Sequence, residues 1–341
     1  MTFHLPLLSA VLLSCGSLGH ACDLCAISSA NSAKGEAISG FSFTLSEQFI
    51  PYRTEYIEGE EVKIDYGSKG PDYLDKSITH LVPTWNFSDR VGVSLNVPLI
   101  YERYRRFNIL WDESPPAQVT EKGDEFGLGD VSLIGRVTVF RRAEMEWGVS
   151  VTALAGVKFP TGDTSFLKDE AEQALGYNRF FGFSPSHAHN IVTSGVHLSD
   201  LTLGSGSFDG IFGLQTSARW DRWFVNLLAQ YYLRTEGEST YHYGNEVMVN
   251  GGPGAYLLLA KRYTLALQAY AGYESRARDE LFGTKAPNTG MSAWYLGPQV
   301  TFTWGLHFSA QAAVDLPLWI TNNGWQNVPE YRIHGSLTWR F

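Results

Sequence analysis

Two cysteines and two histidines are the residues whose types and spacing could support chemistry. Cys22 and Cys25 form a Cys-x-x-Cys sequence, and a single residue separates His187 from His189. A Cys-x-x-Cys pair can close a disulfide, act as a redox couple or supply two of the four ligands that zinc prefers. The two histidines are weaker evidence for a metal site, because solvated loops also carry histidines at this spacing.

Sequence motifs of common enzymes are missing. The chain has no Gly-x-Ser-x-Gly, no His-Glu-x-x-His and no Walker-type phosphate loop. Cys25 is followed by Ala26 rather than by a histidine, which excludes covalent haem attachment at this motif. We therefore predict that the protein is not an enzyme and has no cofactor.

Composition points to a low-charge, aromatic-rich chain. Charged residues make up 18% of the 341 residues, aromatic residues 14%, and the formal net charge is -9. Soluble proteins carry about 25% charged residues, and nucleic-acid-binding domains carry a basic excess, so no nucleic-acid partner is expected. After residue 21 there is no run of about 18 apolar residues, so spanning helices are not predicted.

The N-terminal residues have the features of an export signal. An apolar stretch over residues 5–13 precedes Gly19-His20-Ala21, which places small residues where a signal peptidase reads them. We predict a signal peptide over residues 1–21, with lipoprotein processing at Cys15 as the alternative. A periplasmic segment over residues 22–37 would then hold the Cys-x-x-Cys motif.

Alternating polarity predicts β-strands along most of the remaining chain. In the last strand, Ile333, Leu337 and Trp339 alternate with Arg332 and other polar residues. Because strand side chains alternate between two faces, one face is apolar and the other polar. We predict twelve strands, over residues 38–57, 75–87, 90–106, 129–142, 146–160, 208–220, 223–236, 246–260, 264–279, 291–304, 306–320 and 329–341.

The connections between these strands alternate in length. Turns of a few residues alternate with longer loops, the longest over residues 58–74, 107–128, 161–207 and 280–290. Outer-membrane barrels have short periplasmic turns and long outer loops, and only a closed barrel satisfies all strand hydrogen bonds in lipid. We therefore predict an all-β fold: a transmembrane antiparallel up-and-down β-barrel of about twelve strands over residues 38–341. We expect a multi-pass protein in the outer membrane of a Gram-negative bacterium. Its partners would be outer-membrane lipid and, through the terminal Phe341, the outer-membrane insertion machinery.

A soluble β-sandwich is the alternative fold. Two features favour the barrel instead. Predicted strands of twelve or more residues exceed the usual five or six. Tryptophans also lie near strand ends on the apolar faces, as in an interfacial girdle: Trp85, Trp294, Trp304, Trp319 and Trp339.

The polar faces of the strands define a candidate lumen lining. A barrel of twelve strands lies between filled small barrels and open porins, so a narrow or partly plugged pore is expected. Basic residues outnumber acids in the lining, which indicates a weak anion preference. Three strand histidines (His80, His307 and His334) are also predicted to face inward. The candidate lining residues are Gln48, Arg136, Lys158, Gln215, Arg219, Asn226, Gln230, Arg234, Gln268, Gln299, Gln311, Asp315, Arg332 and Arg340.

The loop over residues 161–207 is far longer than usual and is expected to be functional or mobile. Residues 166–175 predict a short helix that ends at Gly176. The loop could fold into the lumen and narrow it, or it could form a surface lid or an exposed loop.

Five motifs occur together in order: Gly127-Leu128-Gly129-Asp130, residues 156–163, residues 204–210, Leu296-Gly297-Pro298-Gln299 and the terminal residues 337–341. This set resembles the outer-membrane family named for the meta-pathway of phenol degradation, over most of residues 120–341. The resemblance implies a barrel that transports apolar or aromatic compounds, and it implies no particular binding residues.

Together these observations predict a porin-like outer-membrane channel for passive passage of a small solute, of aromatic or hydrophobic character. The alternative is a barrel scaffold that holds a periplasmic metal or redox protein through the Cys22/Cys25 segment.

Overall fold

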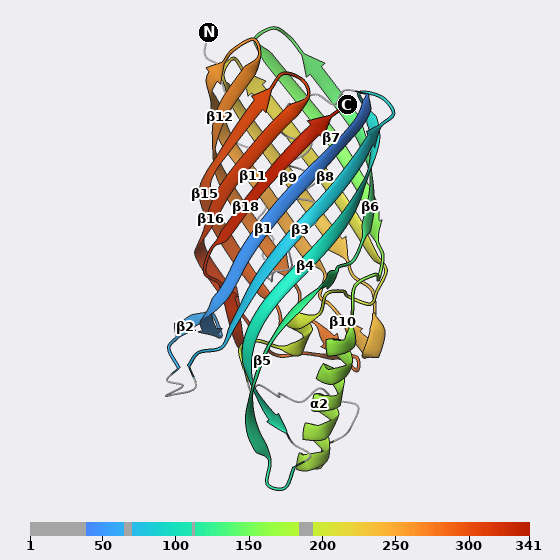
Figure 1. Ribbon diagram of the computed structural model, residues 1–341, viewed down its shortest axis with the longest axis vertical. Coiled ribbons are helices and arrows are strands. Elements are labelled where there is room, and N and C mark those ends of the chain that lie inside the picture. Colours follow the sequence, from blue (N-terminus) through green and yellow to red (C-terminus); the bar gives the residue numbers. More distant parts are fainter. Residues whose placement is uncertain (1–38, 65–69, 111–112, 184–193) are drawn as a thin grey trace, which may run out of the picture.

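The computed structural model describes residues 39–64, 70–110, 113–183 and 194–341. Twelve long strands form a closed antiparallel barrel, as predicted (Figure 1). Strand β1 (Gly40–Ile57) pairs with β3 (Tyr73–Asn86) on one side and with β18 (Arg332–Arg340) on the other, which closes the sheet. The remaining barrel strands are β4 (Val91–Leu110), β6 (Ser132–Ala143), β7 (Trp147–Lys158), β8 (Asp209–Trp220), β9 (Trp223–Leu233), β11 (Glu246–Leu259), β12 (Tyr263–Arg276), β15 (Met291–Trp304) and β16 (Phe308–Asn322).

The barrel has a polar interior and an apolar exterior. On β18, Ile333, Leu337 and Trp339 are exposed, whereas Arg332 and Thr338 are buried. The same alternation runs along the other strands, so the polar side of each strand faces the inside of the closed sheet. The apolar surface that a soluble protein would bury is here on the outside.

Exposed tryptophans lie near both ends of this exterior, and we call these two groups the tryptophan belts. Trp294 and Trp319 are exposed near one end of the barrel, and Trp85, Trp304 and Trp339 are exposed near the other. Trp294 and Trp304 lie on the same strand, ten residues apart. At about 3.3 Å per residue and a strand tilt of about 40°, the belts are roughly 25 Å apart, which is the height of the apolar band of outer-membrane barrels.

The prediction of a loop over residues 107–128 is wrong, because most of these residues form strands. β4 continues to Leu110, and β5 (Ala117–Leu128) pairs with it over its full length. Figure 1 shows this ribbon extending beyond the barrel at the long-loop end. There the exposed face of β5 meets water rather than lipid, so it can carry Lys122 and Asp124 without the apolar alternation that prediction relies on.

The helix in the long loop is longer than predicted. α2 spans Ser165–Phe181, so Gly176 lies inside it. The helix ends at Gly182, whose φ of 70° is the left-handed conformation that favours glycine at a helix end. Within the described ranges, no helix combines the length and the apolarity needed to cross a membrane.

The other long connections contain short elements. Glu60–Val62 forms β2, and Leu198–Leu201 and Glu238–Thr240 form 3₁₀ turns. The gap between the strands predicted over residues 306–320 and 329–341 is partly strand, since β16 extends to Asn322 and β17 (Trp325–Pro329) pairs with β1. A small sheet joins β10 (Tyr241–His242), β13 (Glu280–Leu281) and β14 (Thr284–Lys285). The C-terminal end marked in Figure 1 lies at the opposite, short-turn end, beside the start of β1.

Candidate functional site: the barrel interior

The fourteen residues predicted to line the lumen are buried or half-buried in the structure. Gln215, Arg219, Asn226, Gln311 and Arg340 are half-buried. The other nine are buried, in strands whose alternate side chains are exposed: Gln48, Arg136, Lys158, Gln230, Arg234, Gln268, Gln299, Asp315 and Arg332. They gather at several levels along the barrel rather than at one site.

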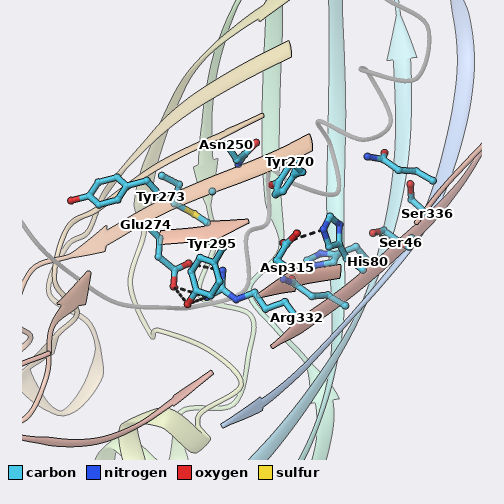
Figure 2. Close-up of a pocket in the computed structure, with 16 residues that line it drawn as sticks. Ser46, His80, Asn250, Tyr270, Tyr273, Glu274, Tyr295, Asp315, Arg332 and Ser336 are labelled. Carbon is cyan, nitrogen blue, oxygen red and sulfur yellow. Dashed lines mark hydrogen bonds and ion pairs between the residues drawn. The ribbon is translucent and has the colours of Figure 1, made fainter. Parts of the chain in front are cut away.

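The middle of the barrel contains a narrow polar pocket (Figure 2). Its free volume is about 40 Å³, which is room for one or two water molecules and not for a larger solute. Gln48, Gln311, Asp315 and Arg332 are among its lining residues. The centre of the lumen is therefore filled by its own side chains.

A charged pair closes one side of this pocket. The Arg332 guanidinium donates to both Glu274 carboxylate oxygens, at 2.7 and 2.5 Å, and the Tyr295 hydroxyl donates to Glu274 at 2.9 Å. Only 1% of Glu274 and 7% of Arg332 is exposed. On the facing side, His334 Nε2 lies 3.2 Å from Asp315 (Figure 2).

A second group of charges fills the neighbouring wall. The Lys158 ammonium lies 3.1 Å from Asp130 and 3.5 Å from Asp209. Arg234 bridges Asp209 and Glu246, at 2.8 and 3.1 Å. Burial by itself would raise the pKa of Asp130, which lies in the loop before β6, but the Lys158 charge and hydrogen bonds from the Ser205 and Gly162 groups bring that pKa below its usual value. The Lys158 charge and these hydrogen bonds therefore stabilise the ionised form of Asp130.

The long-loop end of the barrel is crossed by residues 194–205, which we call the crossing segment. Val196, Leu198 and Leu201 are buried against inward-facing residues of β1, β3 and β4, including Ile50 and Leu74. This part of the long loop therefore matches the predicted alternative in which the loop folds into the lumen. α2, in the same loop, lies outside the barrel (Figure 1).

Hydrogen bonds fix the crossing segment to opposite sides of the barrel. Beside β3, the Ser194 hydroxyl donates to the Asp72 carboxylate at 2.5 Å. Just before β11, the Tyr243 hydroxyl donates to the Ser199 carbonyl at 2.9 Å and lies 2.8 Å from the Thr202 hydroxyl. Because β3 and β11 are separated around the barrel, the segment spans the opening rather than one wall.

Sequence reasoning missed two acidic residues of the interior. Glu102 and Glu274 are buried, and neither was predicted to face inward. The parity that placed Gln268 inside also places Glu274, six residues along the same strand, so the alternation could have found it.

One histidine prediction is wrong. His80 and His334 lie inside the barrel, but His307 is exposed in the turn between β15 and β16, because the strand begins only at Phe308. Its Nδ1 lies 3.0 Å from the Arg340 carbonyl.

The predicted metal and thiol sites lie outside the described residues. This applies to Cys22 and Cys25, to His187 and His189, and to the signal peptide over residues 1–21. In the ranges that the structure does describe, no group of three or more His, Cys, Asp and Glu side chains is arranged to hold a metal ion.

Comparison with solved structures supports the fold. An outer-membrane channel from Pseudomonas putida F1 superposes with a TM-score of 0.57 at 14% sequence identity, over 90% of this chain and 98% of that one. The toluene transporter TodX of Pseudomonas putida gives 0.40 at 9% identity over 96% of both chains. The toluene transporter TbuX of Ralstonia pickettii gives 0.37 at 9% identity, over 89% of this chain and 90% of that one.

The similarity to the first of these structures is high enough to show that this chain has a fold found among outer-membrane barrels. No family model matches this chain, and no curated protein sequence matches it. The resemblance to the phenol meta-pathway family therefore stays a prediction beyond the barrel itself.

Proposed function

We propose that the protein is an outer-membrane channel that passes a small hydrophobic or aromatic solute. The observation that carries this proposal is the inverted distribution of polarity: an apolar exterior between two tryptophan belts around a polar, closed interior. Lipid supplies no hydrogen-bond partners, and a closed barrel needs none. The short-turn end would face the periplasm and the long-loop end the cell exterior.

An aromatic cluster at the end of α2 supports the apolar character of the solute. The Tyr177 and Phe181 ring centroids are 4.6 Å apart, and those of Phe180 and Phe181 are 5.0 Å apart. Phe180, Phe181 and Phe183 are about half exposed although they lie beyond the barrel, where no lipid would cover them. Exposed aromatic side chains beyond the outer end of the barrel would favour capture of an apolar molecule from water.

The interior sets how the solute would pass. The central pocket is too small for a solute, and the crossing segment covers the outer opening. Passage would therefore require both displacement of the crossing segment and rearrangement of the side chains that fill the centre, and we propose that this arrangement is a closed state of the channel. Selection would be steric and electrostatic, without covalent chemistry.

Liposome swelling with the purified full chain tests the proposal. Proteoliposomes and empty liposomes are compared in a panel of sugars, small inorganic anions and aromatic acids. We expect aromatic acids to enter proteoliposomes faster than sugars of similar size. Equal rates with and without the protein, or recovery of the chain as a detergent-free soluble species, would refute the channel.

A further inference from the structure

A cavity of the barrel interior lies at the short-turn end, and we call it the basic vestibule. Its free volume is about 420 Å³, about ten times that of the central pocket. Small-molecule sites commonly measure about 300–1,000 Å³. Five cationic residues line the vestibule and no acidic residue does: Arg141, Arg142, Arg219, Lys261 and Arg262.

The charge of the vestibule is weakly compensated. Arg141 and Arg142 have carboxylates nearby at the exposed rim, at 3.3 Å (Asp89) and 3.4 Å (Glu144). The Arg219 guanidinium instead donates to the Asp221 backbone carbonyl at 3.2 Å. Among the described residues, no carboxylate lies within 4 Å of the Arg219, Lys261 or Arg262 cationic groups.

Positive charge continues deeper into the barrel. The Arg136 guanidinium, 5% exposed, donates to the Asn86 amide oxygen at 2.5 and 3.1 Å rather than to an acid. The buried acids Asp130, Asp209 and Glu246 lie instead toward the long-loop end, paired with Lys158 and Arg234. The short-turn half of the lumen is therefore electropositive although the whole chain is acidic.

An aromatic wall lies beside the cations. Phe224, which is buried, and Tyr256 both line the vestibule, with ring centroids 5.1 Å apart. Phe224 stands directly opposite Arg219 on the paired strands β9 and β8. A guanidinium and a ring on the same wall suit a ligand that carries an anionic group on an aromatic body.

We propose that the basic vestibule binds an aromatic carboxylate, with the carboxylate on Arg219 and the ring against Phe224 and Tyr256. A planar guanidinium pairs with a carboxylate through two parallel hydrogen bonds. The site rests on the proposed function and deepens it: the solute would be an ionised aromatic acid, held at the periplasmic exit after it passes the narrow centre.

Equilibrium binding by calorimetry tests this on the full chain in a non-ionic detergent. Benzoate is the probe, inorganic phosphate supplies charge without a ring, and benzyl alcohol supplies a ring without charge. We expect saturable benzoate binding that weakens as salt rises, because added ions screen the pair. Phosphate and benzyl alcohol should each bind at least about tenfold more weakly, since each lacks one half of the interaction.

Variants test whether benzoate binds at a specific site or is attracted by the general positive charge of this end of the barrel. We expect Arg219→Gln to weaken benzoate about tenfold and Arg219→Lys to keep part of the affinity, because the charge is retained without the bidentate geometry. Arg90→Gln is the matched control, since Arg90 is an exposed arginine at the same end outside the lining. Heat-dependent gel mobility confirms that each variant is a folded barrel.

Three results would overturn the proposal: benzoate binding no tighter than benzyl alcohol, phosphate binding as tight as benzoate, or equal affinities for Arg219→Gln and Arg90→Gln. If binding fails while proteoliposomes still swell, the vestibule site is wrong and the channel stands. If binding holds without swelling, the site stands and the channel is wrong.

Discussion

Loosening the crossing segment at Tyr243 should open the channel. The hydroxyl of this residue donates to the Ser199 carbonyl and contacts the Thr202 hydroxyl, and burial raises the Tyr243 pKa so that the proton is retained. Tyr243→Phe removes both contacts and keeps the ring. A neutral hydrogen bond contributes about 0.5–1.5 kcal/mol, so the docked segment should lose about 1–2 kcal/mol.

If the segment must leave before solute passes, that loss sets the change in permeability. A difference of 1–2 kcal/mol corresponds to a factor of about 5–30 in a two-state population. We therefore expect proteoliposome swelling in aromatic acids, and open probability in planar bilayers, to rise by about that factor.

The matched control is Tyr231→Phe, because Tyr231 is exposed on the outer face of β9, away from the segment. Unchanged permeability in a folded Tyr243→Phe barrel, or an equal rise in Tyr231→Phe, would show that the crossing segment does not limit passage.

Three further outcomes follow from the same interior. Gly195→Ala should also raise permeability, because an added Cβ would lie 2.1 Å from the Asn327 amide oxygen and displace the crossing segment. Swelling assays that show no rise in permeability would contradict this. Burial raises the pKa of Asp72 above its usual value, so the folded barrel holds this proton more tightly than the unfolded chain. Stability in urea unfolding should therefore fall as pH rises from the usual aspartate range through the raised pKa, and Asp72→Asn should flatten that profile. Arg332→Met should destabilise the barrel by about 3–5 kcal/mol in urea unfolding, because it leaves Glu274 buried and unpaired. The double variant with Glu274→Gln should recover most of that loss. Additive effects of the two substitutions would contradict the pairing.

The sequence by itself determined the barrel and the sides of its strands. A period of two is local, so it can be read without knowing which strands pair, and it placed Arg332 inside and Trp339 outside. The alternation of short and long connections then predicted that all the long loops lie at one end of the barrel. These features follow from the requirement that the polar face of every strand point the same way in a closed sheet.

Only the tertiary structure decided how the lumen is filled. Glu274 and Arg332 are 58 positions apart, and Ser194 and Asp72 are 122 apart, so nothing local marks them as partners. β5 lacked a readable pattern because it extends beyond the barrel, where no lipid requires an apolar face. Contacts across the lumen depend on barrel circumference and register, which are properties of the closed sheet and not of any single strand.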